Sequence, residues 1–163
     1  MNTDNFTNNN KKAEELLKDQ NYLWTILFEQ ARDGIVVLNQ SGKVVVANKK
    51  FENMLAYSNK ELNNMYVWNW DNSFCKNDIL SKIKEIDQQG HHFETTHIRK
   101  DGTVIDVELS NSVTIFENEK IIFCICRDIT QRKIYEKKIY SLATTDSLTG
   151  LYNRTEFILN SQS

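Results

Sequence analysis

Three cysteines and three histidines are the side chains of this sequence best suited to metal binding or nucleophilic chemistry. Cys124 and Cys126 lie two residues apart in an apolar run, so in a strand they share one face. Two thiols without a cluster of further His or Cys residues make a poor zinc site, because structural zinc takes four ligands. His91 and His92 follow Gly90 in a predicted turn, which favours solvated side chains. The sequence therefore predicts no metal site, and it predicts that the two strand cysteines pack in the core.

One strand residue and a group of aromatic residues could bind a small molecule. His97 shares a predicted strand face with Phe93 and Thr95, and a neutral imidazole in a cavity both donates and accepts hydrogen bonds. The aromatic residues precede a predicted helix over 78–89, where they either close a pocket or fill the core. The nearby Asp71 could bind a polar ligand, although its residue type favours a cap on the next helix. The candidate ligand-binding residues are Trp68, Trp70, Phe74 and His97.

Composition and charge exclude several classes of protein. The chain has 163 residues, and its net charge of −2 with scattered Lys and Arg argues against nucleic-acid binding. The longest apolar stretch, Tyr22–Phe28, is far shorter than the roughly 20 residues that cross a bilayer, and the polar residues 1–10 do not resemble a secretion signal. Three cysteines suit a reducing compartment better than a disulfide framework. We therefore expect a cytoplasmic protein without a membrane span.

The spacing of apolar residues predicts the elements that position these side chains. A disordered segment over 1–10 precedes a helix over 11–32. Two β-branched runs, 35–38 and 44–46, are separated by a turn signal and predict a hairpin. Asn48 is suited to cap a short helix that follows this hairpin.

Strand patterns dominate the second half. The runs 93–99, 103–115 and 121–126 each predict a strand, and a helix rich in Lys and Glu follows over 130–144. Alternation in 103–115 places Ile105, Val107, Leu109, Val113 and Ile115 on one face. The order predicts an α+β domain with a five-stranded antiparallel sheet, helices on one face and flanking terminal helices.

Four strings in this chain resemble PAS domains in sequence, order and spacing. They are DGIVVL at 33–38, VANKKF at 46–51, RKDG at 99–102 and RDIT at 127–130. The resemblance covers about residues 22–130 and implies a sensor domain over 33–129. In such domains an Asp-Ile-Thr triplet joins the last strand to an output helix, here 130–144. The resemblance to PAS domains therefore implies signal input.

The string DSLTGLYNR at 146–154 is similar to the opening of GGDEF domains, which are bacterial diguanylate cyclases. The resemblance implies that residues 145–163 begin such a domain and that Asn153 contacts the guanine base of GTP in a complete parent. The catalytic carboxylates of the family would lie beyond residue 163. We therefore expect no catalytic residue and no enzymatic activity in this chain, within a parent that makes cyclic di-GMP from GTP.

Known PAS cofactors require signatures that this sequence lacks. Light-sensing flavin members carry a reactive cysteine in an Asn-Cys-Arg-Phe-like string, and the neighbours of Cys75 differ from it. Haem-binding members use an axial ligand, usually histidine, on a helix that corresponds to 78–89, where this chain has none. We expect neither flavin nor haem, and the identity of a small-molecule ligand stays open.

The resemblance leaves two functions in competition. In the first, the domain binds a small ligand or a partner and regulates the downstream cyclase through a dimeric helical linker. In the second, it is a ligand-free dimerisation module. For signal relay we consider Asp128, Thr130 and Arg132, with an ion pair between Asp128 and Arg132 across one helical turn. The expected homodimer seam starts at Arg132 and continues through Tyr135, Ile139 and Leu142.

Overall fold

The computed structural model describes residues 19–87 and 89–144. The expected segments 1–10 and 145–163, with Asn153, lie outside these residues, as does the first part of the expected helix 11–32. The elements from β1 to α5 are β1 (Gly34–Asn39), β2 (Val44–Ala47), α2 (Lys49–Leu55), α3 (Asn59–Leu62), η1 (Val67–Asn69), α4 (Lys76–Glu85), β3 (His91–Ile98), β4 (Val104–Phe116), β5 (Glu119–Asp128) and α5 (Thr130–Thr144).

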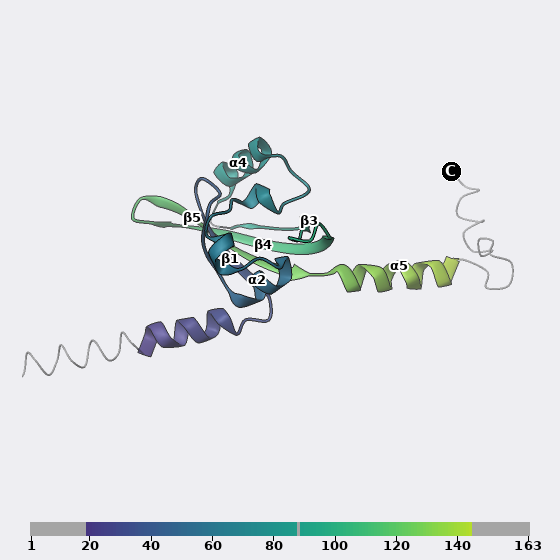
Figure 1. Ribbon diagram of the computed structural model, residues 1–163. Coiled ribbons are helices and arrows are strands. Elements are labelled where there is room, and N and C mark those ends of the chain that lie inside the picture. Colours follow the sequence, from purple (N-terminus) through teal and green to yellow (C-terminus); the bar gives the residue numbers. More distant parts are fainter. Residues whose placement is uncertain (1–18, 88, 145–163) are drawn as a thin grey trace, which may run out of the picture.

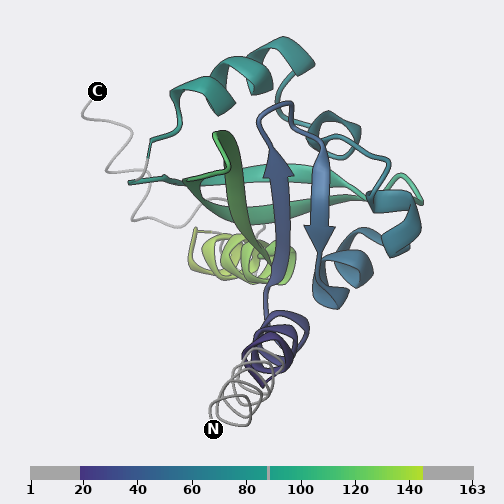
Figure 2. The same cartoon turned by 90° about the vertical axis from the view of Figure 1, so that its left-hand side faces the viewer.

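The five strands form one antiparallel sheet in the spatial order β2-β1-β5-β4-β3 (Figure 1). In Figure 2, α4 lies above the strands and α5 lies below them, so the sheet separates α4 from α5. This arrangement confirms the predicted α+β class. The largest fully buried side chains lie between the sheet and the connecting helices, and they include Trp70, Phe51, Leu55, Leu62, Ile122, Val36 and Val107.

Asn48 fixes the junction between the N-terminal helical segment, β1 and α2. Its fully buried Oδ1 accepts hydrogen bonds from the backbone N–H of Ile35 at 2.8 Å and of Phe51 at 2.9 Å. Its Nδ2 donates to the carbonyl oxygens of Phe28 at 2.9 Å and Asp33 at 3.1 Å. The amide therefore caps α2, as predicted, and also satisfies buried backbone groups of two other segments.

Burial alternates along β4 only where helices cover the sheet. Ile105 and Val107 are buried on the inner face, and Leu109 packs against the same core. Ile115, which the alternation places on the same face, is not covered, because 61% of the residue is exposed. It pairs with Lys120 near the tip of the β4–β5 hairpin, which projects past the rest of the domain (Figure 1).

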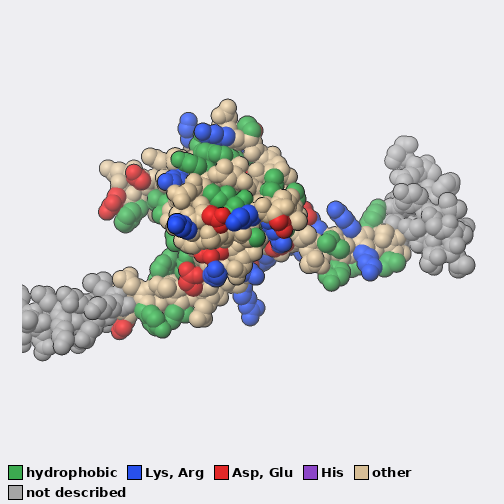
Figure 3. Space-filling view, in the orientation of Figure 1, with side chains coloured by type: hydrophobic (Ala, Val, Ile, Leu, Met, Phe, Trp, Pro, Cys, Tyr) green, Lys and Arg blue, Asp and Glu red, His purple; other side chains and the backbone are tan. Residues whose placement is uncertain are grey.

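The terminal helices leave the domain in opposite directions (Figure 1). In the described part of the expected helix 11–32, residues 19–29 are helical and the chain turns at Gln30. Phe28 is buried, but Figure 3 shows hydrophobic side chains on the exposed surface of both terminal helices. None of the helices within the described residues has the length and apolar character needed to cross a membrane.

Candidate ligand-binding cleft

Two adjoining spaces lie between α4 and the sheet. The inner cavity has a volume of about 60 Å³ and walls that are mostly apolar, supplied by β1, α4, β3, β4 and β5. The outer cleft has a volume of about 590 Å³ and runs along the first residues of β3. Five residues line both spaces and therefore form the passage between them: Phe74, Lys82, Ile86, Phe93 and Asn111.

Three polar residues line the inner cavity: Asp71, Lys82 and Asn111. Oδ1 of Asp71 accepts the backbone N–H groups of Ser73 at 2.9 Å and Phe74 at 3.0 Å, which shapes the loop before α4. Burial raises the pKa of the Asp71 carboxyl above its usual value. Nζ of Lys82 lies 4.3 Å from the ring centroid of Phe74, and both residues line the passage between the two spaces. The passage therefore carries a positive charge. This set can recognise a small molecule that combines an apolar body with a polar group.

Asn111 is a site residue that the sequence reasoning missed. It is a polar residue among the apolar residues on the inner face of β4, and only 8% of it is exposed. Its Oδ1 accepts a hydrogen bond from the backbone N–H of His91 at 2.9 Å. An added Cβ at Gly90, whose φ is +70°, would lie 2.0 Å from the carbonyl oxygen of Asn111. The position could have been found, because a polar residue at an inward position of an alternating strand signals a buried amide.

The structure separates the four predicted ligand-binding residues. Phe74 lines both spaces, whereas Trp70 is fully buried with its ring edge on Phe51, at a centroid separation of 5.5 Å. Trp68 stacks on Tyr66 at 4.7 Å, and neither tryptophan lines either space. His97 also lies in the core, away from both linings.

Three titratable core side chains on β3 and β5 are held neutral by burial. Burial lowers the pKa of His97 to about 4, and its Nδ1 has no hydrogen-bond partner. Burial raises the pKa of the Cys124 thiol to about 12 and that of Cys126 well above its usual value. Both cysteines are therefore protonated at neutral pH, as their predicted packing role requires.

Among residues 19–87 and 89–144, no three His, Cys, Asp or Glu side chains gather as a metal site.

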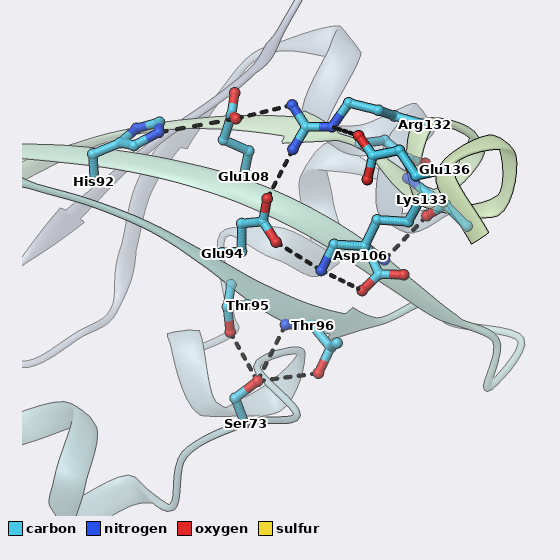
Figure 4. A network of polar contacts seen from close by, with 12 residues as sticks. Ser73, His92, Glu94, Thr95, Thr96, Asp106, Glu108, Arg132, Lys133 and Glu136 are labelled. Carbon is cyan, nitrogen blue, oxygen red and sulfur yellow. Dashed lines mark hydrogen bonds and ion pairs between the residues drawn. The ribbon is translucent and has the colours of Figure 1, made fainter. Parts of the chain in front are cut away.

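The opposite side of the sheet carries a group of charges that we call the outer ionic cluster: Glu94, Asp106, Glu108, Arg127, Arg132 and Lys133. Figure 4 labels all of these residues except Arg127. Glu94 of β3 stands directly opposite Glu108 of β4. Arg132 of α5 contacts both, at 2.8 Å and 3.3 Å, and Lys133 contacts Glu94 at 2.7 Å. The hydrogen bond from Lys133 lowers the pKa of Glu94, so this carboxylate is charged at neutral pH.

The expected ion pair between Asp128 and Arg132 is wrong. Asp128 ends β5 and lies outside α5, so the two residues do not share a helical face. Asp128 instead accepts the backbone N–H of Thr130 at 2.9 Å and pairs with Arg99 at 3.0 Å. The hydroxyl of Thr130 accepts the backbone N–H of Asp106 at 3.0 Å. The first residue of α5 is therefore fastened to β4, and the end of β5 is fastened to Arg99, which follows β3.

The four residues of the expected dimer seam lie in two different environments. Tyr135, Ile139 and Leu142 are highly exposed on α5, whereas Arg132, the fourth member, is occupied by sheet carboxylates. The expected turn histidines, His91 and His92, in fact begin β3, where they pair with β4 and border the outer cleft.

Comparison with known proteins identifies the domain. The chain is 28% identical over 153 residues to signaling protein YkoW of Bacillus subtilis, which covers 90% of this chain and 18% of that protein. It is 26% identical over 122 residues to diguanylate cyclase DgcM of Escherichia coli O157:H7, which covers 73% of this chain and 29% of the cyclase. The chain thus spans less than a third of either curated relative.

A solved structure shows the same fold. The PAS domain of an HTR-like protein from Haloarcula marismortui superimposes with a TM-score of 0.69 and 28% identity, covering 73% of this chain and 99% of that one. The family model for the PAS domain matches residues 32–131, more than half of the chain. The chain therefore belongs to the PAS domain family.

Proposed function

We propose that this PAS domain is the cytoplasmic signal-input module of a diguanylate cyclase. A small ligand binds in the cleft between α4 and β3, and its presence is relayed through α5 to a GGDEF domain that begins near residue 145. The observation that supports this most directly is the continuity of the cleft, β3 and the first turn of α5. The name of the relative DgcM and the string at 146–154 support the cyclase as the output.

The shape of the cleft supports a ligand that is partly apolar. Its apolar portion would enter the inner cavity, and its polar portion would reach Lys82 or Asn111 at the passage. Phe74 would contact the ligand directly, whereas Trp70 and His97 would support the cleft from the core. We expect neither flavin nor haem, so the purified protein should be colourless.

Dimerisation is the proposed means of output. The exposed apolar residues of α5, Tyr135, Ile139 and Leu142, would pair with the same residues of a second copy. A seam this short is marginal by itself, so the exposed residues Leu23 and Leu27 of the N-terminal helical segment would contribute to the dimer. Analytical ultracentrifugation at high micromolar concentration should show a dimer, and Ile139→Asp should shift it towards monomer.

A ligand-free dimerisation module is the second candidate. The volume of the inner cavity, about 60 Å³, favours it, because typical ligand sites occupy roughly 300–1,000 Å³. In that case the outer cleft would be a solvent-filled surface feature, and the dimer alone would bring two cyclase domains together.

A binding experiment separates the two candidates. Backbone amide NMR spectra of the chain would be recorded with and without a panel of small carboxylates, amines and heterocycles. Sensing predicts saturable shifts at Phe74, His91 and Asn111 that Asn111→Ala weakens, whereas Ser112→Ala on the outer side of β4 leaves them unchanged. A panel that shifts none of these amides, together with an intact dimer, would favour the second candidate. In neither case should the 163-residue chain convert GTP to cyclic di-GMP.

A further inference from the structure

The first half of β3 has one side on the cleft and the other on the output helix. Phe93 points inward and lines both the inner cavity and the outer cleft. Its neighbour Glu94 borders the outer cleft and also binds Arg132 and Lys133 of α5. Phe93 and Glu94 belong to the same strand backbone. A displacement of β3 at the cleft therefore also moves Glu94, which anchors α5.

The edge of the same strand is held by a separate contact from the loop before α4. The hydroxyl of Ser73 lies 2.9 Å from the hydroxyl of Thr95, 3.1 Å from the hydroxyl of Thr96 and 3.1 Å from the backbone N–H of Thr96 (Figure 4). Beyond these contacts, towards His91, β3 borders the open cleft. The segment that carries Glu94 is thus the part of the edge strand next to the space a ligand would fill.

The charges around Glu94 make this anchor sensitive to position. Glu94 and Glu108 are like charges at directly opposed positions of an antiparallel pair, an arrangement that is destabilising without a counter-ion. Arg132 supplies that counter-ion by contacting both carboxylates at once. The two strands and α5 therefore stabilise one another, and a shift of β3 weakens the contacts that hold the first turn of α5.

We propose that Glu94 is the positioning residue that couples the cleft to the output helix, with Arg132 and Lys133 as its partners on α5. This inference rests on the proposed sensing function, since it names the route by which occupancy of that cleft is relayed. Filling or emptying the cleft beside Phe93 shifts Glu94, and the first turns of α5 become more or less firmly attached to the sheet.

Hydrogen exchange of α5 amides tests this coupling in the 163-residue chain without a ligand. Phe93→Ala empties part of the cleft, and Glu94→Gln removes the anchor charge. Each single change should raise the exchange rates at residues 133–137 by about two- to fivefold, the range expected for a partly exposed ion pair. The double variant should exchange no faster than Glu94→Gln alone, because the route is already broken.

Glu136→Gln is the matched control, because Glu136 contacts Arg132 within α5 at 3.6 Å and does not touch β3. Combined with Phe93→Ala, it should leave the full effect of the cleft change in place. Phe93→Leu provides a milder change should Phe93→Ala unfold the chain. If Phe93→Ala or Phe93→Leu acts equally strongly with Glu94 present or replaced, the coupling through Glu94 is refuted.

The outcome is separable from the ligand test. A panel without any bound compound, together with a Glu94-dependent effect of Phe93, would refute sensing by that cleft and support the coupling. A bound compound together with additive effects of the two substitutions would support sensing and refute Glu94 as the route.

Discussion

The two sides of β3 and β4 differ in almost every physical respect, although the same backbone carries both. On the inner side, Val107 is fully buried and His97 is held neutral. On the outer side, Glu94 and Glu108 form ion pairs with basic residues of α5 and β5. The buried inner side therefore contributes most of the free energy of folding. The exposed ion pairs of the outer side hold α5 against the sheet but add little to this free energy.

The largest effect should come from the inner side. Trp70→Ala removes a fully buried ring from its contact with Phe51 and should lower the free energy of unfolding by about 3–5 kcal/mol. Val104→Ala, at a half-exposed position of β4, should change it by less than about 0.5 kcal/mol. Urea denaturation measures both. Similar values for the two would remove the distinction between the faces.

The next effect is a dependence on pH that originates at His97. Its pKa is about 4 when folded and 6.5 in the unfolded reference, so the unfolded state binds the proton more tightly. Its contribution is constant above pH 7, and stability falls as the pH drops from 6.5 to 4, by about 3 kcal/mol in total. The difference between wild type and His97→Gln, followed by denaturation across this range, isolates the effect. A constant difference would contradict the burial of a neutral imidazole.

A smaller effect is expected where the two sides meet, at the end of β5. Asp128→Ala removes the acceptor for the Thr130 N–H and should lower the free energy of unfolding by about 1 kcal/mol. Asp128→Asn keeps a side-chain oxygen for the cap but loses the charge that pairs with Arg99. Thermal denaturation of the two variants therefore separates the cap from the ion pair. In the proposed parent cyclase, Asp128→Ala should also break the dependence of cyclase output on the state of the sensor.

The outer side alone should give the smallest change in stability. Arg132→Gln removes the bridge between Glu94 and Glu108 and should lower Tm by about 1–2 °C at low salt. At 1 M salt the difference should disappear, because exposed charges are then screened. Lys137→Gln, on the same helix, should have no effect at either salt concentration. A Tm decrease for Arg132→Gln that persists in high salt would mean that Arg132 acts through packing.

The sequence predicted what local patterning decides and missed what depends on neighbouring strands. The alternation in β4 and the cap at Asn48 are local, and both were predictable. The exposure of Ile115 depends on how far the helices extend over the sheet, which no local pattern contains. The partners of Arg132 depend on strand register, because Glu94 and Glu108 come from different strands.

The candidate site was predicted less well for the same reason. The sequence suggested a pocket near the aromatic residues that precede α4, but which of their side chains face the cavity depends on the path of an irregular loop. Trp70 ends η1 and turns into the core, whereas Phe74, four residues later, faces the cleft. Aromatic type alone does not distinguish these positions.

The hydrogen bonds of Asn48 bear on how cooperatively the domain opens. Its four bonds join segments 20, 15, 13 and 3 residues away in sequence, and they use both donors and both acceptor lone pairs of one amide. None of these segments can detach without leaving a buried polar group unsatisfied. The end of the N-terminal helical segment, the start of β1 and the first turn of α2 should therefore open as one unit, with the Ile35 and Phe51 amides exchanging hydrogen together.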